Sequence, residues 1–92
     1  MSVIPNSVDN IFTFVLTNGT FNIIAEYGVM AVAMKLTAGT ATFIGSLKLG
    51  SQSSTAIPLA VNDPITISQN QAIDVLTIDA TAGTVQIICR RA

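Results

Sequence analysis

Side chains suited to chemistry are few in this chain of 92 residues, which contains no histidine and one cysteine, Cys89. Without imidazole, neither a Ser-His-Asp triad nor a Cys-His pair can be assembled. The serines Ser51, Ser53 and Ser54 lie in a polar loop, with no neighbouring lysine to activate them as nucleophiles. A single thiol also rules out an internal disulfide and a thiolate cluster for a metal. We therefore expect no catalytic, cofactor-binding or metal-binding residues, and we interpret Cys89 as a small apolar residue on a strand.

Paired carboxylates are the remaining route to acid–base chemistry, as in glycoside cleavage. Asp74 and Asp79 are the nearest pair in the sequence, but their odd separation on one extended strand would place them on opposite faces. The segment VNDPITISQN has only Asp63 as an acid, which is too few oxygen ligands for a calcium site. We interpret these acids as solvated surface groups or turn caps, and we expect the protein not to be an enzyme.

A glycine loop that binds phosphate is a third possibility, because TAGT occurs at residues 37–40 and 81–84, and TNGT occurs at residues 17–20. A phosphate-binding glycine loop leads from a strand into a helix and usually has a lysine nearby. Each of these segments leads instead into another strand-like run, with no lysine after it. We therefore predict three hairpin turns that join neighbouring strands, with Asn18-Gly19 as the strongest turn pair.

Alternation of apolar and polar residues is the main signal for the elements that position these side chains. Along residues 84–90, Val85, Ile87 and Cys89 share one face, while Ile88 lies on the other with polar neighbours. About eight short runs between turn residues are expected to be strands: Ile11–Leu16, Thr20–Glu26, Val29–Thr37, Thr40–Leu49, Ser54–Leu59, Ile65–Ser68, Ile73–Asp79 and Thr84–Arg91. Their number and spacing predict an all-β domain, a single antiparallel β-sandwich resembling a jelly roll.

Three segments need separate interpretation. Residues 28–37, GVMAVAMKLT, contain Met and Ala, which favour helices; their apolar residues also alternate, and we predict a strand. Pro58 lies inside an expected strand, where its missing N–H suits an edge. Residues 1–10 are interpreted as an N-terminal arm that precedes the β-sandwich domain of residues 11–92.

The charge balance limits the kinds of partner. Five acidic and four basic residues give a net charge of −1, whereas nucleic-acid binding needs a basic face. Only 10% of residues are charged and 50% are hydrophobic, so part of the outer surface is expected to contact other protein.

The longest apolar run, residues 28–34, is far short of the roughly 20 residues of a membrane helix. With no secretory signal pattern at the start, we expect synthesis in a cytosol and neither a nucleic-acid nor a membrane partner.

A series of motifs extends from Tyr27 to Arg91: YGVMAVAMKLTAGTATFIGS, a small polar loop, IPLAVNDPITIS, and AIDVLTIDATAGTVQII. This order resembles small β-sandwich structural proteins of tailed bacteriophages, of the capsid auxiliary or decoration type. The resemblance implies a virion protein, made in the host cytoplasm, that sits on a capsid lattice or fibre as a symmetric oligomer. None of the motifs carries a catalytic residue.

The first functional hypothesis is therefore a non-enzymatic structural protein that forms a homo-oligomer, a dimer or trimer, and binds the major capsid protein or another virion protein. The residues expected to make contacts are Val3, Ile4 and Pro5 in the arm, Pro58 at an edge, and Arg90 and Arg91 at the C-terminal end. A head-fibre or tail component is an alternative, and so is a carbohydrate- or ligand-binding β-sandwich module. A sugar site would be expected to show an exposed aromatic platform beside acid or amide groups, and Tyr27 is the only polar aromatic residue.

Overall fold

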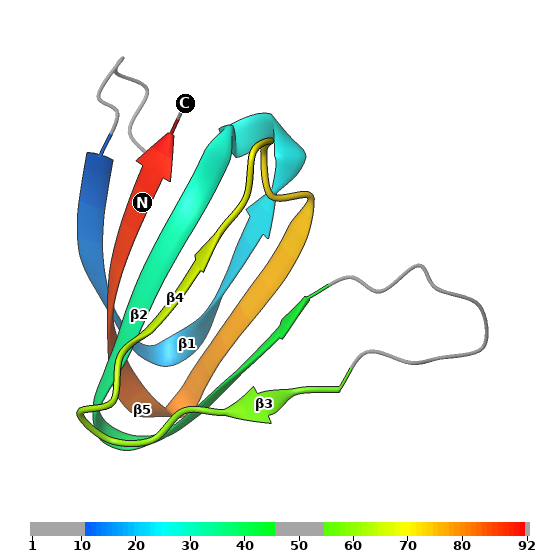
Figure 1. Ribbon diagram of the computed structural model, residues 1–92. Helices are drawn as coiled ribbons and strands as arrows, with labels where there is room; N and C mark the ends of the chain where they lie inside the picture. The colour runs from blue at the N-terminus through cyan, green and yellow to red at the C-terminus, as the bar shows by residue number, and fades with distance from the viewer. Residues whose placement is uncertain (1–10, 46–54, 92) are drawn as a thin grey trace.

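The computed structural model describes residues 11–45 and 55–91, which form one antiparallel sheet of five strands (Figure 1). The strands are β1 (Ile11–Ile24), β2 (Val29–Gly45), β3 (Ile57–Pro58), β4 (Ile65–Ser68) and β5 (Val75–Arg91), and the short 3-10 helix η1 (Ala25–Tyr27) joins β1 to β2. Their order is β1-β5-β2-β3, and β4 also pairs with β2. No helix in the described parts of the chain is long and apolar enough to cross a membrane. The N-terminal arm predicted at residues 1–10 lies outside the described residues.

The predicted all-β class and antiparallel pairing are confirmed, but the number of strands is wrong. Each of the long strands β1, β2 and β5 contains two of the expected short runs. The structure has one sheet in its described residues, so the predicted sandwich or jelly-roll arrangement is not confirmed. Residues 29–37 extend as part of β2, as predicted, because Val32, Met34 and Leu36 can then enter the core together.

The T-x-G-T segments are bends inside strands, and the prediction of three hairpins is wrong. The two TAGT segments pair with each other, with Gly39 opposite Gly83, and TNGT lies beside them, with Thr17 opposite Thr84. The ladder shifts register at these bends, which is the effect of β-bulges, where an extra residue bends a strand. Positive φ angles at Asn18 (52°) and Gly39 (74°) accompany the bends. Because the bends are aligned, the whole sheet folds over along one line (Figure 1).

Glycine is required where the two TAGT segments meet. A Cβ atom on Gly39 would collide with the carbonyl oxygen of Ala82 and lie 2.8 Å from Cα of Gly83. A Cβ atom on Gly83 would collide with the carbonyl oxygen of Thr40 and lie 2.9 Å from that of Ala38. These neighbours are backbone atoms and cannot rotate away, so the absence of side chains allows the two strands to bend together.

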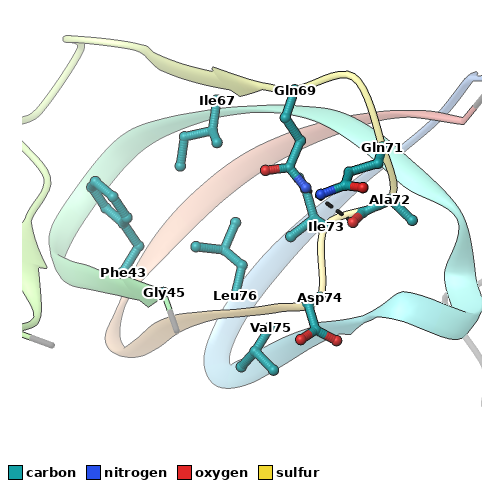
Figure 2. Close-up of a pocket in the computed structure, with 10 residues that line it drawn as sticks. All are labelled: Phe43, Gly45, Ile67, Gln69, Gln71, Ala72, Ile73, Asp74, Val75 and Leu76. Carbon is teal, nitrogen blue, oxygen red and sulfur yellow. Dashed lines mark hydrogen bonds between the residues drawn. The ribbon is translucent and has the colours of Figure 1, made fainter. Parts of the chain in front are cut away.

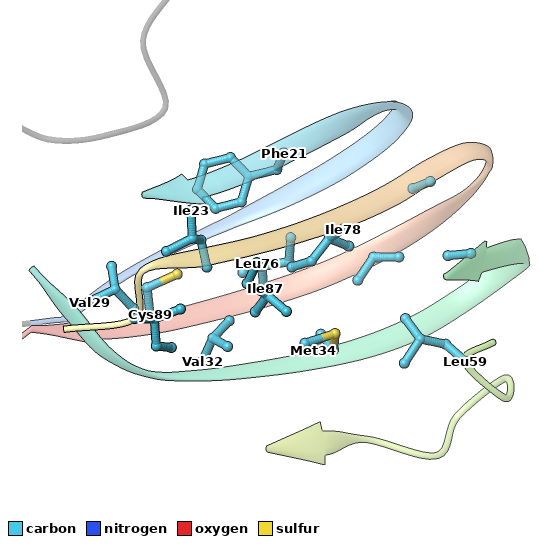
Figure 3. Close-up of a cluster of buried hydrophobic side chains, with 14 of the residues drawn as sticks. Phe21, Ile23, Val29, Val32, Met34, Leu59, Leu76, Ile78, Ile87 and Cys89 are labelled. Atoms are coloured by element: carbon cyan, nitrogen blue, oxygen red, sulfur yellow. The ribbon is translucent and has the colours of Figure 1, made fainter. Parts of the chain in front are cut away.

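The hydrophobic core fills the space between the two halves of the bent sheet (Figure 3). Alternation holds along β5, where Val85, Ile87 and Cys89 are buried as predicted while Ile88 is exposed. The buried hydrophobic residues are Phe12, Phe21, Ile23, Val29, Val32, Met34, Leu36, Ala41, Leu59, Ile73, Leu76, Ile78, Ala80, Val85, Ile87 and Cys89. All of them except Leu59 and Ile73 come from the three long strands, so the bend brings both ends of each strand into one core.

The two sides of the sheet end differently. β1 is the edge strand on one side over its whole length. On the other side, the two short strands β3 and β4 cover separate parts of β2. Pro58 lies in β3 at the end of the strand order, so the prediction that it belongs to an edge is confirmed.

Candidate functional site

A cavity of about 450 Å³ lies between β4, the C-terminal part of β2 and the loop that enters β5 (Figure 2). Two backbone hydrogen bonds hold the loop on β2: Gln69 N donates to Met30 O at 3.0 Å, and Ile73 N donates to Val29 O at 2.7 Å. The lining residues are Phe43, Gly45, Ile67, Gln69, Gln71, Ala72, Ile73, Asp74, Val75 and Leu76. Since both ends of the loop are fixed, the shape of the cavity is set by the fold.

This cavity combines an apolar interior with a polar rim. Ile73 and Leu76 are buried, and Phe43 is half-buried. Gln71 and Asp74 are exposed at the rim, while the side chain of Gln69 donates a hydrogen bond to the carbonyl oxygen of Ala72 at 2.9 Å. Amide and carboxylate groups in a cavity with an aromatic ring suit a neutral ligand with hydroxyl groups.

The carboxylates Asp74 and Asp79 are not brought together. Asp74 lines the cavity of Figure 2, whereas Asp79 lines a separate surface cavity of about 170 Å³ beside the bend. The backbone N–H of Thr81 donates to Asp79 Oδ1 at 3.0 Å, and the hydroxyl of Thr81 donates to the same oxygen. The hydroxyl bond and then the backbone bond lower the pKa of Asp79, since both favour the charged form. Asp79 is therefore a turn cap at the bend, as one of our interpretations of the acids proposed.

Cys89 lies fully buried on β5, as predicted for a small apolar residue on a strand. Burial raises the pKa of its thiol to about 11, with a smaller opposing effect from the charge of Arg91. The thiol is protonated at neutral pH and is shielded from reagents. Within residues 11–45 and 55–91, no three His, Cys, Asp or Glu side chains are grouped in a way that would hold a metal ion.

The residues predicted to contact partners fall in different places. Val3, Ile4 and Pro5 lie outside the described residues, and Pro58 is exposed on β3. Arg90 is exposed on the outer face of the sheet, opposite Ile11 of β1.

The neighbouring Arg91 is half-buried, and its guanidinium carbon lies 5.3 Å from the centre of the Phe12 ring. Such cation–π contacts stabilise the charge against an aromatic face. The two arginines therefore act on different sides of the sheet: Arg90 is available at the surface, and Arg91 helps to hold the end of β5 against β1.

An apolar surface on the outer side of the sheet was missed by the sequence analysis. We call it the Ile88 face; it consists of the apolar residues Ile11, Val15, Ala31, Ala33 and Ile88 together with Thr13, Lys35, Gln86 and Arg90. Ile11 and Val15 are each 59% exposed and Ile88 is 50% exposed. Ile88 lines three adjoining shallow cavities, whose only charged lining residues are Lys35 and Arg90.

One signal in the sequence could have revealed this face. Ile88 interrupts the polar side of an alternating strand, between Gln86 and Arg90. An isolated exposed isoleucine is ordinary, however. Ile88 lies opposite Ala33 of β2 and Thr13 of β1, with Ile11 and Val15 on either side of Thr13. The patch can therefore be recognised only when the pairing of the strands is known.

Comparison of the chain with protein-family models, with curated proteins and with solved structures finds no match.

Proposed function

We propose that the protein is a non-enzymatic structural component of a virus particle, a capsid auxiliary or decoration protein that forms a homo-oligomer and binds a capsid lattice. The observation that carries the proposal is the Ile88 face, where Ile11, Val15 and Ile88 expose large apolar side chains side by side. The motifs from Tyr27 to Arg91 that resemble phage virion proteins support the same class. The protein would be made in the host cytoplasm and would then belong to the virion.

The Ile88 face also defines the chemistry of its partner. Contiguous exposed apolar patches on soluble domains mark interaction surfaces, and covering a half-exposed isoleucine or valine is worth roughly 1 kcal/mol. Lys35 and Arg90 flank the apolar centre. A matching surface on the capsid protein would be apolar with acidic residues at its border, because charge complementarity directs association.

The proposed fold refines the coarser description of one antiparallel sheet. We propose that the two halves of the bent sheet serve as the two layers of a compact β-sandwich. Phe21 and Ile78 from one half and Val32 and Ile87 from the other belong to the same buried cluster, which supports this view. The outer side of one layer, the Ile88 face, is then left for docking.

Cosedimentation tests the proposed function. The purified full chain is mixed with phage capsids that lack it, and we expect it to sediment with them. Ile88→Asp should reduce binding at least tenfold, because it places a carboxylate in the apolar centre. Val75→Asp is the matched control, since Val75 is 46% exposed on the other half of the sheet. Unchanged binding by Ile88→Asp, or absence of the chain from particles, would contradict the proposal.

A head-fibre or tail component would use the same surface. Immunogold labelling of intact particles separates these locations, because a decoration protein covers the capsid shell whereas the other components label a single vertex, the fibres or the tail.

A ligand-binding module is a second candidate, favoured by the cavity of Figure 2. Its Phe43 ring, the Gln71 amide and the Asp74 carboxylate together could bind a sugar. A glycan array tests this function: binding by the parent chain that is lost in Gln71→Ala and Asp74→Ala would support it, and absence of binding would eliminate it.

A further inference from the structure

The outer edge of β1 is the longest unpaired strand edge in the described structure. β1 has 14 residues and is paired along its length with β5 on one side only. The other strands that end the sheet, β3 and β4, have 2 and 4 residues. Within residues 11–45 and 55–91, no strand pairs with the other side of β1, so these residues leave its outward backbone groups without a strand partner.

Before its bend at Asn18, over residues 11–17, this edge has none of the devices that usually prevent strand pairing. Edge strands in soluble proteins are commonly short, or carry a charged residue or a proline. β1, with the sequence IFTFVLTNGTFNII, has neither charge nor proline and is rich in β-branched and aromatic residues, which favour pairing. The short strand β3, by comparison, contains Pro58.

We propose that two copies of the chain join antiparallel through residues 11–15 of β1, around a twofold axis at Thr13. The inference rests on the proposed function and specifies the surface by which the protein forms its homo-oligomer. Two sheets of five strands would become one continuous sheet across the dimer. The Ile88 faces of the two copies would lie side by side on the same surface.

The pattern of exposed side chains selects the register. A twofold axis at Thr13 places Ile11 of each copy opposite Val15 of the other, and these are the two most exposed large apolar side chains of the structure, at 59% each. An axis at Phe14 or Val15 would place Ile11 opposite Thr17 or Gly19 instead. Only the register centred on Thr13 covers both apolar side chains with each other.

The same register pairs the remaining side chains favourably. Phe12 would lie opposite Phe14 of the second copy, and aromatic pairs across strands stabilise a sheet. Within one copy these two rings are already stacked, with centres 6.4 Å apart and planes at 9°. Ile11 and Val15 would form the centre of a row of four side chains that crosses the dimer. Arg90 would flank Ile11 at one end of this row, and Gln86 of the other copy would flank Val15 at the other end, because these residues are their partners on β5. No like charges are therefore brought together in this row.

Disulfide cross-linking tests the register. In Thr13→Cys, the two sulfhydryl groups would lie directly opposite each other, where Cα atoms are about 4.5–5.5 Å apart, within the range that a disulfide spans. We expect a covalent dimer of the full chain on a non-reducing gel after mild oxidation. In the matched control Val15→Cys, the two cysteines would be about 13 Å apart and should stay unlinked. Background from Cys89 is small because it is buried.

The double variant Ile11→Cys/Val15→Cys should restore the cross-link, since it places a cysteine opposite a cysteine. Equal cross-linking of Val15→Cys and Thr13→Cys would overturn the register. A parent chain that is dimeric by light scattering and yet gives no cross-link in Thr13→Cys would overturn the pairing through β1.

Charge on the edge provides a second test. Val15→Lys should raise the dissociation constant of the dimer at least tenfold, whereas Ile57→Lys on β3, at a residue that is 50% exposed, should leave it unchanged. Light scattering over a range of concentrations measures both, and circular dichroism confirms that each variant is folded. A parent chain that is monomeric at every concentration, or a dimer unaffected by Val15→Lys, would overturn the inference, as would a strand from a different protein captured at this edge.

The two proposals fail in different ways. Cosedimentation with capsids but no cross-link in Thr13→Cys would leave the proposed function standing and remove the β1 dimer. A cross-linked dimer that binds no particle would remove the proposed function and leave the β1 dimer.

Discussion

Individual residues in this protein are restricted most strongly by close backbone contacts at the bend. Gly39 and Gly83 face each other across two strands, and each leaves no space for a Cβ atom. Gly39 also has a φ of 74°, in the left-handed region that L side chains rarely adopt. By contrast, a Cβ atom on Gly45 would lie 3.8 Å from its nearest neighbour, the carbonyl oxygen of Val75, which is an ordinary contact.

Replacing Gly83 by alanine should therefore destabilise the fold. The new methyl group would meet the carbonyl oxygens of Thr40 and Ala38, and overpacking of this kind costs about 3 kcal/mol. Urea denaturation of the two variants measures the free energy of unfolding, with Gly45→Ala as the control that should change it by less than about 1 kcal/mol. Equal stability of the two variants would show that the bend can relax.

Cys89 makes the stability depend on pH in the alkaline range. Its folded-state pKa is about 11 and its ordinary value is 9.0, so the unfolded chain loses the thiol proton first. The contribution of the neutral thiol is fully present below pH 9 and is lost as the pH rises from 9 towards 11, by up to about 1.4 kcal/mol per pH unit. Thermal unfolding of the parent and of Cys89→Ala over pH 7–11 checks this: the difference between them should shrink as the pH rises, and a constant difference would contradict it.

At the scale of the elements, local alternation predicted the strands and the faces of their side chains, because period two is a property of each strand alone. Val85, Ile87 and Cys89 were placed correctly on this basis. The bends were misinterpreted because glycine flanked by threonine suits both a hairpin and a β-bulge. What distinguishes a bulge from a hairpin here is that Gly39 pairs with Gly83. This pairing joins residues far apart in the sequence, so a local sequence pattern does not predict it.

The candidate sites could not be predicted from the sequence because they too depend on the pairing of distant strands. The cavity of Figure 2 takes Phe43 from β2, Ile67 from β4 and Asp74 from the loop before β5. Each has an ordinary sequence environment, and their proximity follows from the long-range register. The exposure of Ile88, in contrast, could be deduced from its position on the polar side of its strand.

The arrangement of elements also predicts how local stability varies. β5 is paired with β1 on one side and β2 on the other, whereas β3 holds only Ile57 and Pro58. Native-state hydrogen exchange should therefore show amides in the middle of β5 at least about 100-fold slower than those of β4 and the segment around β3. Exchange of β5 as fast as that of β4 would mean that the central strand opens locally.

The whole molecule has two unlike outer surfaces because the sheet folds over. The Ile88 face is apolar with Lys35 and Arg90. On the other half, Thr77 donates a hydrogen bond from its hydroxyl to Asn22 Oδ1 at 2.8 Å, beside the charged Asp79. Ile24 and Val75 are also exposed on this half, at 38% and 46%, so the Ile88 face differs from it in its more exposed apolar side chains and its positive charges.

The same topology should make the chain fold slowly for its size. β1 pairs with β5 from the Ile11–Arg90 pair onward, so the first described strand cannot be completed before the last one is in place. Closing such long loops lowers the entropy of the chain before any stabilising contact forms. For this reason, β proteins dominated by non-local pairs fold in about milliseconds to seconds. Stopped-flow refolding from urea, followed by circular dichroism at a concentration where the chain is monomeric, measures the rate. A main phase complete within roughly 100 µs would mean that local contacts, and not the pairing of β1 with β5, limit folding.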